Sequence, residues 1–198
     1  MGEVPADKTE RLIVEGLVVT SDEDGRPHLA PMGPQVDRNL RRFTLRPFCT
    51  STTFANLART GCAVFHVTDD VELLARAAIG RIESQPAYRP IASPPHFALT
   101  DCCHWFALRM ASANIDPPRA AFECEVVETG TGRAWFGFNR AKHAVVEAAI
   151  LATRIGILPD AEIRNELTRL AIAVQKTAGE QERRAWQLLI DYVNEKLG

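Results

Sequence analysis

The chain has 198 residues, of which 46% are hydrophobic, and its formal net charge is -2 at pH 7. That length can bury a substantial core, either as one domain with an appendage or as two small domains. The balanced charge gives no broad positive field, so we expect no nucleic-acid partner and no membrane partner. No apolar run approaches the roughly 18 residues of a membrane span, and residues 2–8 lack the pattern of a signal peptide. The sequence therefore predicts a cytoplasmic protein.

The first two-thirds of the chain has the pattern of strands joined by turns and short helices. Apolar stretches predict the strands, and clusters of Gly, Pro, Asp, Asn and Ser predict the turns between them. In chain order the sequence predicts strands at 12–20, 29–32 and 43–48, a helix at 52–60 ending at Gly61, a strand at 62–68, a helix capped by Asp69, a loop at 83–95, and strands at 105–113, 120–128 and 134–138.

About six antiparallel strands without long crossover helices favour a small closed or partly closed barrel over a parallel sheet. The last third of the chain predicts helices at 140–155, 160–176 and 180–196. The second and third of these carry an apolar stripe on one face, whereas the first is apolar on nearly every side. We therefore expect the first helix to lie between the barrel and the other two helices.

The five cysteines do not indicate a metal or redox motif. They are odd in number, and none belongs to a Cys-x-x-Cys pair. Zinc ligation by Cys102, Cys103, His104 and His96 would need two adjacent ligands, which the common zinc motifs do not use. A redox disulfide within the vicinal pair lacks a nearby cationic cluster that would lower a thiol pKa. We expect reduced, mostly packed thiols and no metal.

The helix expected after Asn139 has an unusual charge at its start. Arg140, Lys142 and His143 lie in its first turn, where the backbone N–H groups already present a partial positive charge. The other expected helix starts carry Asp or Glu instead. A bound phosphate or carboxylate would explain this cationic turn, and a solvated surface is the alternative.

A second candidate anion site is the expected helix start at Ser51, Thr52 and Thr53, with Asn56 one turn later. Hydroxyl and free N–H groups at a helix start can bind a phosphate. Capping alone would account for one of these hydroxyls. Two further segments lie before this helix start. Arg46-Pro47-Phe48 is the nearer one, and Ala30-Pro31-Met32-Gly33 is the more distant one.

The chain resembles the domain-of-unknown-function family 447 over nearly its whole length. The resemblance is carried by the segments 30–33, 45–48, 51–57 and, most specifically, 137–148. That family is part of the FMN-binding split-barrel group, which is similar to flavin reductases and more distantly to pyridoxamine phosphate oxidases. The resemblance implies a mainly β plus α fold, a six-stranded antiparallel split barrel with short helices at 1–138 and a C-terminal three-helix subdomain packed on it at 139–198.

The resemblance also implies a homodimer with FMN at the barrel surface near the subunit interface. Met32 and Gly33 would face the flavin ring, and Arg46 and Phe48 would flank it. The phosphate would be held by Ser51, Thr53 and Asn56. A further group would either complete this site or form a second anion pocket: Asn139, Arg140, Lys142 and His143.

The sequence contains no nucleophile–base–acid constellation. His28, His66 and His96 are isolated, and we expect them to be structural or exposed. This pattern suits a flavin protein, because the cofactor carries the redox chemistry. The resemblance thus predicts an FMN-dependent oxidoreductase of unknown substrate, reduced by a nicotinamide nucleotide or another small donor. The alternatives are a flavin carrier or sensor without turnover, and a barrel that binds another phosphorylated ligand.

Overall fold

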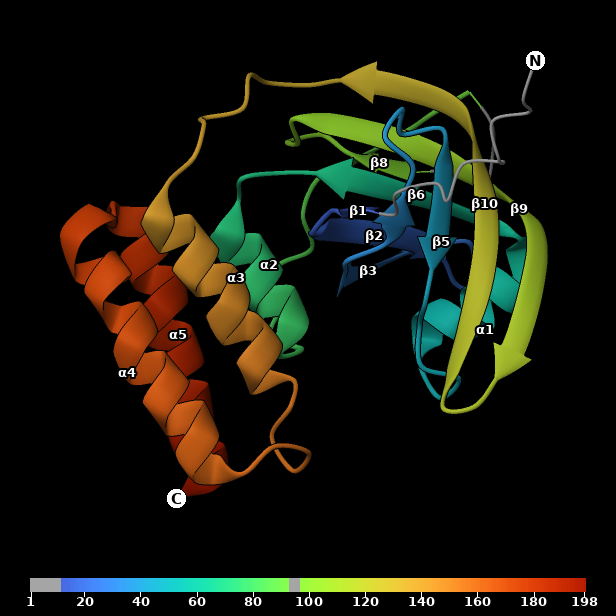
Figure 1. The fold of residues 1–198 in the computed structure, drawn as a ribbon. Coiled ribbons are helices and arrows are strands. Elements are labelled where there is room, and N and C mark those ends of the chain that lie inside the picture. Colours follow the sequence, from blue (N-terminus) through green and yellow to red (C-terminus); the bar gives the residue numbers. More distant parts are fainter. Residues whose placement is uncertain (1–11, 93–96) are drawn as a thin grey trace, which may run out of the picture. The chain divides into compact units, whose positions relative to one another are not determined.

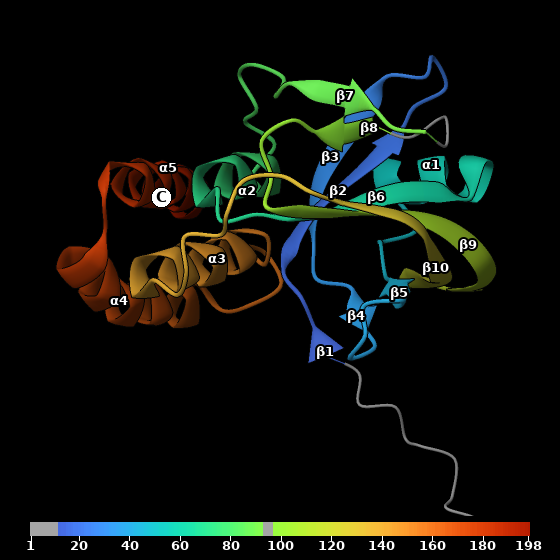
Figure 2. The same ribbon diagram turned by 90° about the horizontal axis from the view of Figure 1, so that it is seen from above.

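The computed structural model describes residues 12–92 and 97–198, which form two compact units (Figures 1 and 2). The barrel unit contains the chain up to Val67 together with Ala87–Gly132. The helical unit contains Thr68–Pro86 and Arg133–Gly198, so it takes in a helix from the middle of the chain as well as residues 139–198. His96 and the last residues of the predicted 83–95 loop lie outside the described residues.

The barrel unit is built on an antiparallel sheet that curls into a half-barrel. The order of its strands is β1-β4-β5-β10-β9-β6-β2-β3. The strands are β1 (Leu12–Ile13), β2 (Gly16–Ser21), β3 (Pro27–Met32), β4 (Gln35–Val36), β5 (Arg42–Leu45), β6 (Cys62–Val67), β9 (His104–Asp116) and β10 (Arg119–Thr131).

The prediction of six strands is wrong, because the sheet has eight strands within the described part of the chain. The single strand expected at 12–20 is divided into β1 and β2, and these two pair with different neighbours. The short strand β4 was not expected at all, since two residues carry no readable alternation. The strand expected at 43–48 ends at Leu45.

Two short links force the sheet to close on itself. β1 and β2 are six strand spacings apart in the sheet order, about 29 Å if the sheet were flat. Only two residues join them, and that link spans at most about 10 Å. The two-residue link from β3 to β4 crosses the same seam, and the Val14 N–H donates to the Pro34 carbonyl across it at 3.2 Å. The sheet must therefore curl until the ends of the linked strands lie within about 10 Å of each other.

The core of the barrel unit lies inside this curled sheet. β9 and β10 form a long hairpin that bends around it (Figure 1). The ring of Phe43 contacts those of Phe65 and Phe106, with centroids 5.4 and 5.2 Å apart. Other fully buried members of the cluster include Val18, Leu45, Leu57, Leu108 and Phe122.

Two expectations about the middle and end of the barrel region are corrected. The region expected to be a loop contains β7 (Tyr88–Pro90), which pairs with β8 (Phe97–Leu99) in a separate two-stranded sheet. Residues 134–138, expected to be a strand, have no regular structure. The Phe136 N–H donates to the Asp69 carboxylate at 2.7 Å instead of to a neighbouring strand.

The helix α1 (Thr52–Thr60) begins and ends where the sequence predicts. The Ser51 hydroxyl accepts from the Phe54 N–H at 3.1 Å. Gly61 ends the helix in the left-handed region, with φ 64°, and its N–H donates to the Leu57 carbonyl. Both ends therefore follow from the short-range rules of helix capping.

The helical unit consists of α2 (Val71–Ala78), α3 (Arg140–Ala152), α4 (Asp160–Thr177) and α5 (Glu180–Leu197) (Figure 1). α3 contacts all three of the others and buries small residues against them. The cap of α2 is Asp70, whose carboxylate accepts from the Leu73 N–H, so the expectation that Asp69 caps this helix is wrong. In the described residues, no helix combines the length and apolarity that crossing a membrane requires.

His66 is the buried histidine that joins three strands of the barrel unit. Its side chain is fully buried, its Nδ1 lies 3.2 Å from the Leu17 carbonyl, and its Nε2 accepts from the Leu99 N–H at 3.0 Å. Burial lowers the pKa of His66 from 6.5 to about 4. The imidazole is therefore neutral in the folded protein at neutral pH.

This burial predicts an acid-sensitive barrel. Between pH 6.5 and about 4 the unfolded chain binds a proton at His66 that the folded protein does not, so stability falls as the pH drops through this range. The full loss is roughly 3 kcal/mol. Chemical denaturation across this range should show a flatter pH dependence for His66→Gln than for the wild type. Equal slopes in the two proteins would contradict this account.

Candidate functional site

The start of α1 presents hydrogen-bond donors without acidic neighbours in its first turn. The hydroxyl and carbonyl of Ser51 accept from the N–H groups of Phe54 and Ala55. The N–H groups of Thr52 and Thr53 lie at the positive end of the helix, and no acceptor binds them among the residues that the structure describes. Such an end is suited to bind an anion through the backbone.

Arg119 adds a positive charge close to this helix start. Its guanidinium lies over the Phe48 ring, 3.7 Å from the centroid, and donates to the Arg46 carbonyl at 2.7 Å. Phe48 lies four residues before the first residue of α1, and its carbonyl accepts from the Ser51 N–H at 2.9 Å. The Arg119 guanidinium and an aromatic ring that is 42% exposed thus lie just before the helix start.

No local feature of the sequence indicates a role for Arg119. Its position depends on an isolated bridge that pairs Arg119 with Phe48, about 70 residues earlier in the chain. The Ala120 N–H donates to the Pro47 carbonyl at 3.1 Å and fixes this pairing. Pairings of this kind arise only when the β10 strand lies beside the segment that leads into α1.

The three predicted phosphate ligands already have structural roles. The Ser51 hydroxyl donates to the Phe48 carbonyl at 2.8 Å while it caps the helix. Asn56 is buried, and its amide donates to the Thr20 hydroxyl at 3.0 Å. Thr53 is buried as well. Their assignment to a phosphate stays a prediction, and backbone N–H groups are the donors that the geometry leaves open.

Met32 and Gly33 lie at the end of β3, on an edge of the sheet. Met32 is half-buried and pairs with Gly16 in the neighbouring strand. A side chain at Gly33 would collide with the Glu15 carboxylate, which gives this glycine a packing role as well. On β3, His28 pairs with Thr20 and lies four residues before Met32, roughly 13 Å along the strand. The predicted ring region and Asn56 thus lie at opposite ends of one strand.

The cationic start of α3 is partly neutralised within the helical unit itself. Asn139 caps the helix by accepting from the Ala141 and Lys142 N–H groups. The Lys142 ammonium forms an ion pair with the Glu182 carboxylate at 2.8 Å, and the two side chains are only 14% and 9% exposed. α5 therefore supplies an anion to this turn. Arg140 and His143 are exposed.

Two acidic groups respond to this arrangement. Burial raises the pKa of Glu182, but the bonds from Lys142 and the Gly179 N–H outweigh it and hold the pKa below its usual value. Burial also raises the pKa of Asp69. Its ion pair with Arg133 and the hydrogen bond from the Phe136 N–H outweigh this effect and lower the pKa. Both carboxylates are thus ionised at neutral pH.

The predicted site residues fall into two groups in different units. Met32, Gly33 and the segment 46–56 belong to the barrel unit, whereas residues 139–143 belong to the helical unit. Whether the two groups act on one ligand stays a prediction. In the described ranges, no cluster of three or more His, Cys, Asp or Glu side chains is placed to hold a metal ion.

Solved structures with this fold include several flavin proteins. An FMN-bound protein of Methanosarcina mazei is 20% identical, with a TM-score of 0.79 over 93% of this chain and 96% of the other. A flavin reductase domain protein from Arthrobacter sp. FB24 is 21% identical, with a TM-score of 0.51 over 64% and 82%. The styrene monooxygenase flavin reductase from Pseudomonas putida S12 is 13% identical, with a TM-score of 0.50 over 60% and 81%. The barrel unit therefore has the split-barrel fold of flavin reductases.

The family is shown by two sequence matches. Residues 14–133 match the protein of unknown function (DUF447) N-terminal domain, and residues 139–191 match the protein of unknown function (DUF447). The chain belongs to this family, which confirms the resemblance seen in its sequence. The search of curated proteins gave no match.

The ion pair between Lys142 and Glu182 predicts a structural role for this lysine. Lys142→Met would leave a buried carboxylate without its counter-ion and should cost about 3 to 5 kcal/mol of unfolding free energy. Chemical denaturation measures this loss. The double variant with Glu182→Gln should recover most of it, and the exposed control Arg140→Met should change stability by less than about 0.5 kcal/mol. A loss below about 1 kcal/mol in the single variant would refute the role.

Proposed function

We propose that this protein binds FMN in its barrel unit and acts as a flavin-dependent oxidoreductase. The observation that carries the proposal is family membership shared with an FMN-bound protein whose fold covers 93% of this chain. The flavin reductases of similar fold support the same class of cofactor.

The start of α1 fits the phosphate. Its Thr52 and Thr53 N–H groups point along the helix dipole, and no acidic residue in the first turn opposes an anion. Arg119, whose guanidinium lies over the Phe48 ring before this helix, supplies positive charge for a dianionic phosphate. The Thr52 side chain is exposed, so its hydroxyl can also donate.

The open edge of the sheet fits the ring. Met32 and Gly33 end an edge strand, so the backbone on the outer side of β3 has no neighbouring strand in the sheet. Backbone N–H groups there can bond the polar edge of a flavin, while the half-buried Met32 side chain offers an apolar contact. The roughly 13 Å between this point and the α1 side of β3 lets one elongated ligand reach both ends.

The protein's part in the reaction is binding and orientation. Bound FMN would supply the redox chemistry, and the chain supplies position, charge and exclusion of water. Arg140 and His143 are exposed, and in this proposal they bind the phosphate or carboxylate of a second substrate such as a nicotinamide nucleotide. The homodimer is part of this proposal, and light scattering tests it.

Flavin binding and reduction provide the direct test. The purified protein should bind FMN tightly, and NADH or NADPH should bleach the visible absorption band of the bound flavin. If FMN binds tightly but no reductant bleaches its absorption, the result would favour a flavin carrier or sensor. A colourless protein that does not bind FMN, yet binds other phosphorylated compounds, would contradict the flavin proposal.

Charge reversal at Arg140 separates binding from helix stability. Arg140→Glu should stabilise α3 slightly, by about 0.3 to 1 kcal/mol, because an acidic side chain suits a helix start. It should also weaken the affinity for FMN or for the nicotinamide nucleotide, measured by titration. Arg183→Glu is the matched control, since Arg183 is also exposed and lies in the first turns of α5.

The two variants give distinct outcomes. A loss of ligand affinity in Arg140→Glu alone supports a ligand role for this turn. The same affinity in the wild type and both variants would assign Arg140 to ordinary surface, while leaving the FMN proposal to be judged by the absorption experiment.

A further inference from the structure

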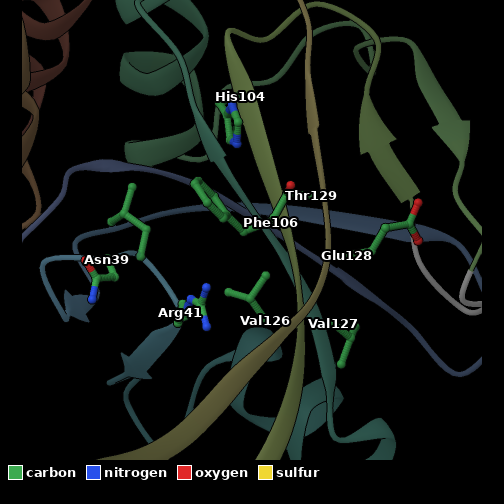
Figure 3. Close-up of a pocket in the computed structure, with 9 residues that line it drawn as sticks. Asn39, Arg41, His104, Phe106, Val126, Val127, Glu128 and Thr129 are labelled. Carbon is green, nitrogen blue, oxygen red and sulfur yellow. The ribbon is translucent and has the colours of Figure 1, made fainter.

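A groove of about 640 Å³ opens in the barrel unit (Figure 3). It is bounded by the turn between β4 and β5, the beginning of β9 and the last part of β10. Its volume is within the range of small-molecule sites, roughly 300 to 1,000 Å³. The residues that line it include Asn39, Arg41, His104, Phe106, Val126 and Glu128.

One wall of the groove is a turn held by Asp37. The Asp37 carboxylate accepts from the N–H groups of Arg41 and Arg42 at 2.7 and 3.0 Å. Within this turn Leu40 has φ 52°, a left-handed conformation that a leucine rarely adopts. The surrounding hydrogen bonds hold that residue in place, with its side chain packed against the barrel core. Asn39 and Arg41 are therefore presented by a fixed backbone.

The opposite wall is a part of β10 that extends beyond its partner strand. β5 pairs with β10 only as far as Glu125, and the Val126 N–H then donates to the Arg41 carbonyl at 3.0 Å. The pairing of β10 with β9 shifts between Val126 and Glu128, which leaves Val127 as a bulge. Bulges of this kind are common at barrel rims and next to active sites, where they redirect side chains.

The groove has an aromatic floor and a rim of hydrogen-bonding groups. Phe106 is buried, and the His104 ring lies 4.6 Å from it at 43°. In Figure 3 the side chains of Asn39 and Arg41 lie on the same side of β10 as these rings and Val126, whereas Glu128 extends to the other side. A ligand between them would meet apolar surface below and cationic or neutral donors along one edge.

We propose that this groove binds a planar aromatic or heteroaromatic compound that carries a carboxylate or another anionic edge. The ring would pack on Phe106 and Val126, and the Arg41 guanidinium would pair with the anion. This site is separate from the proposed phosphate site, because Val126 is seven residues along β10 from Arg119, about 20 Å. The inference does not rest on the proposed flavin function.

Nicotinate is a suitable probe because it is small, planar and anionic. Titrated into the full chain and followed by NMR, it should shift the amide signals of the groove residues in a saturable way. Arg41→Met keeps the length of the side chain but removes the charge, and it should weaken binding at least about tenfold. Arg42→Met, the neighbouring arginine that does not line the groove, should bind like the wild type.

Several outcomes would overturn the proposal. They are an absence of saturable shifts at the groove, equal binding of nicotinate to Arg41→Met, and equal binding of the non-planar cyclohexanecarboxylate. If Arg41→Met does not fold, Asn39→Ala tests the same rim at an exposed position and should also weaken binding. Displacement of nicotinate by FMN would identify the groove as the flavin ring site and refute a separate site. Unchanged FMN affinity in Arg41→Met would support the separate site.

Discussion

The closure of the sheet by two very short links governs the rest of the barrel unit. Two residues between β1 and β2 and two between β3 and β4 cannot bridge a flat sheet, so the sheet curls until the strands that each link joins come close together. Gly33 lies in one of these links, and a side chain there would collide with the Glu15 carboxylate in the other. This contact fixes the end of β3, where the proposal places the flavin ring.

The helix dipole gives a partial positive charge to both helix starts that lack acidic residues, but the surroundings of the two starts differ. At α3 the partial positive charge and the Lys142 ammonium are met by Glu182 of α5, so the unit supplies much of its own anion. At α1 the Arg119 guanidinium lies over the Phe48 ring before the helix, and the first turn of the helix contains no acidic residue. This contrast places the proposed phosphate in the barrel unit.

Short-range features were predictable from the sequence, and long-range pairings were not. The cap at Ser51 and the stop at Gly61 depend only on residues within one helix, and both are as expected. Residues 134–138 do not form the expected strand, because the Phe136 N–H donates to the carboxylate of Asp69, almost 70 residues earlier. Arg119 and Glu182 were missed for the same reason: each meets its partner only after the fold has formed. The extra strands β1 and β4 are two residues each, too short for any periodicity.

A crystal structure of the protein with FMN tests the central claim most directly. The account predicts the phosphate at the Thr52 and Thr53 N–H groups, beside Arg119, with the flavin ring against Met32 and Gly33 at the sheet edge. A phosphate bound elsewhere, with the α1 start facing only solvent, would contradict it.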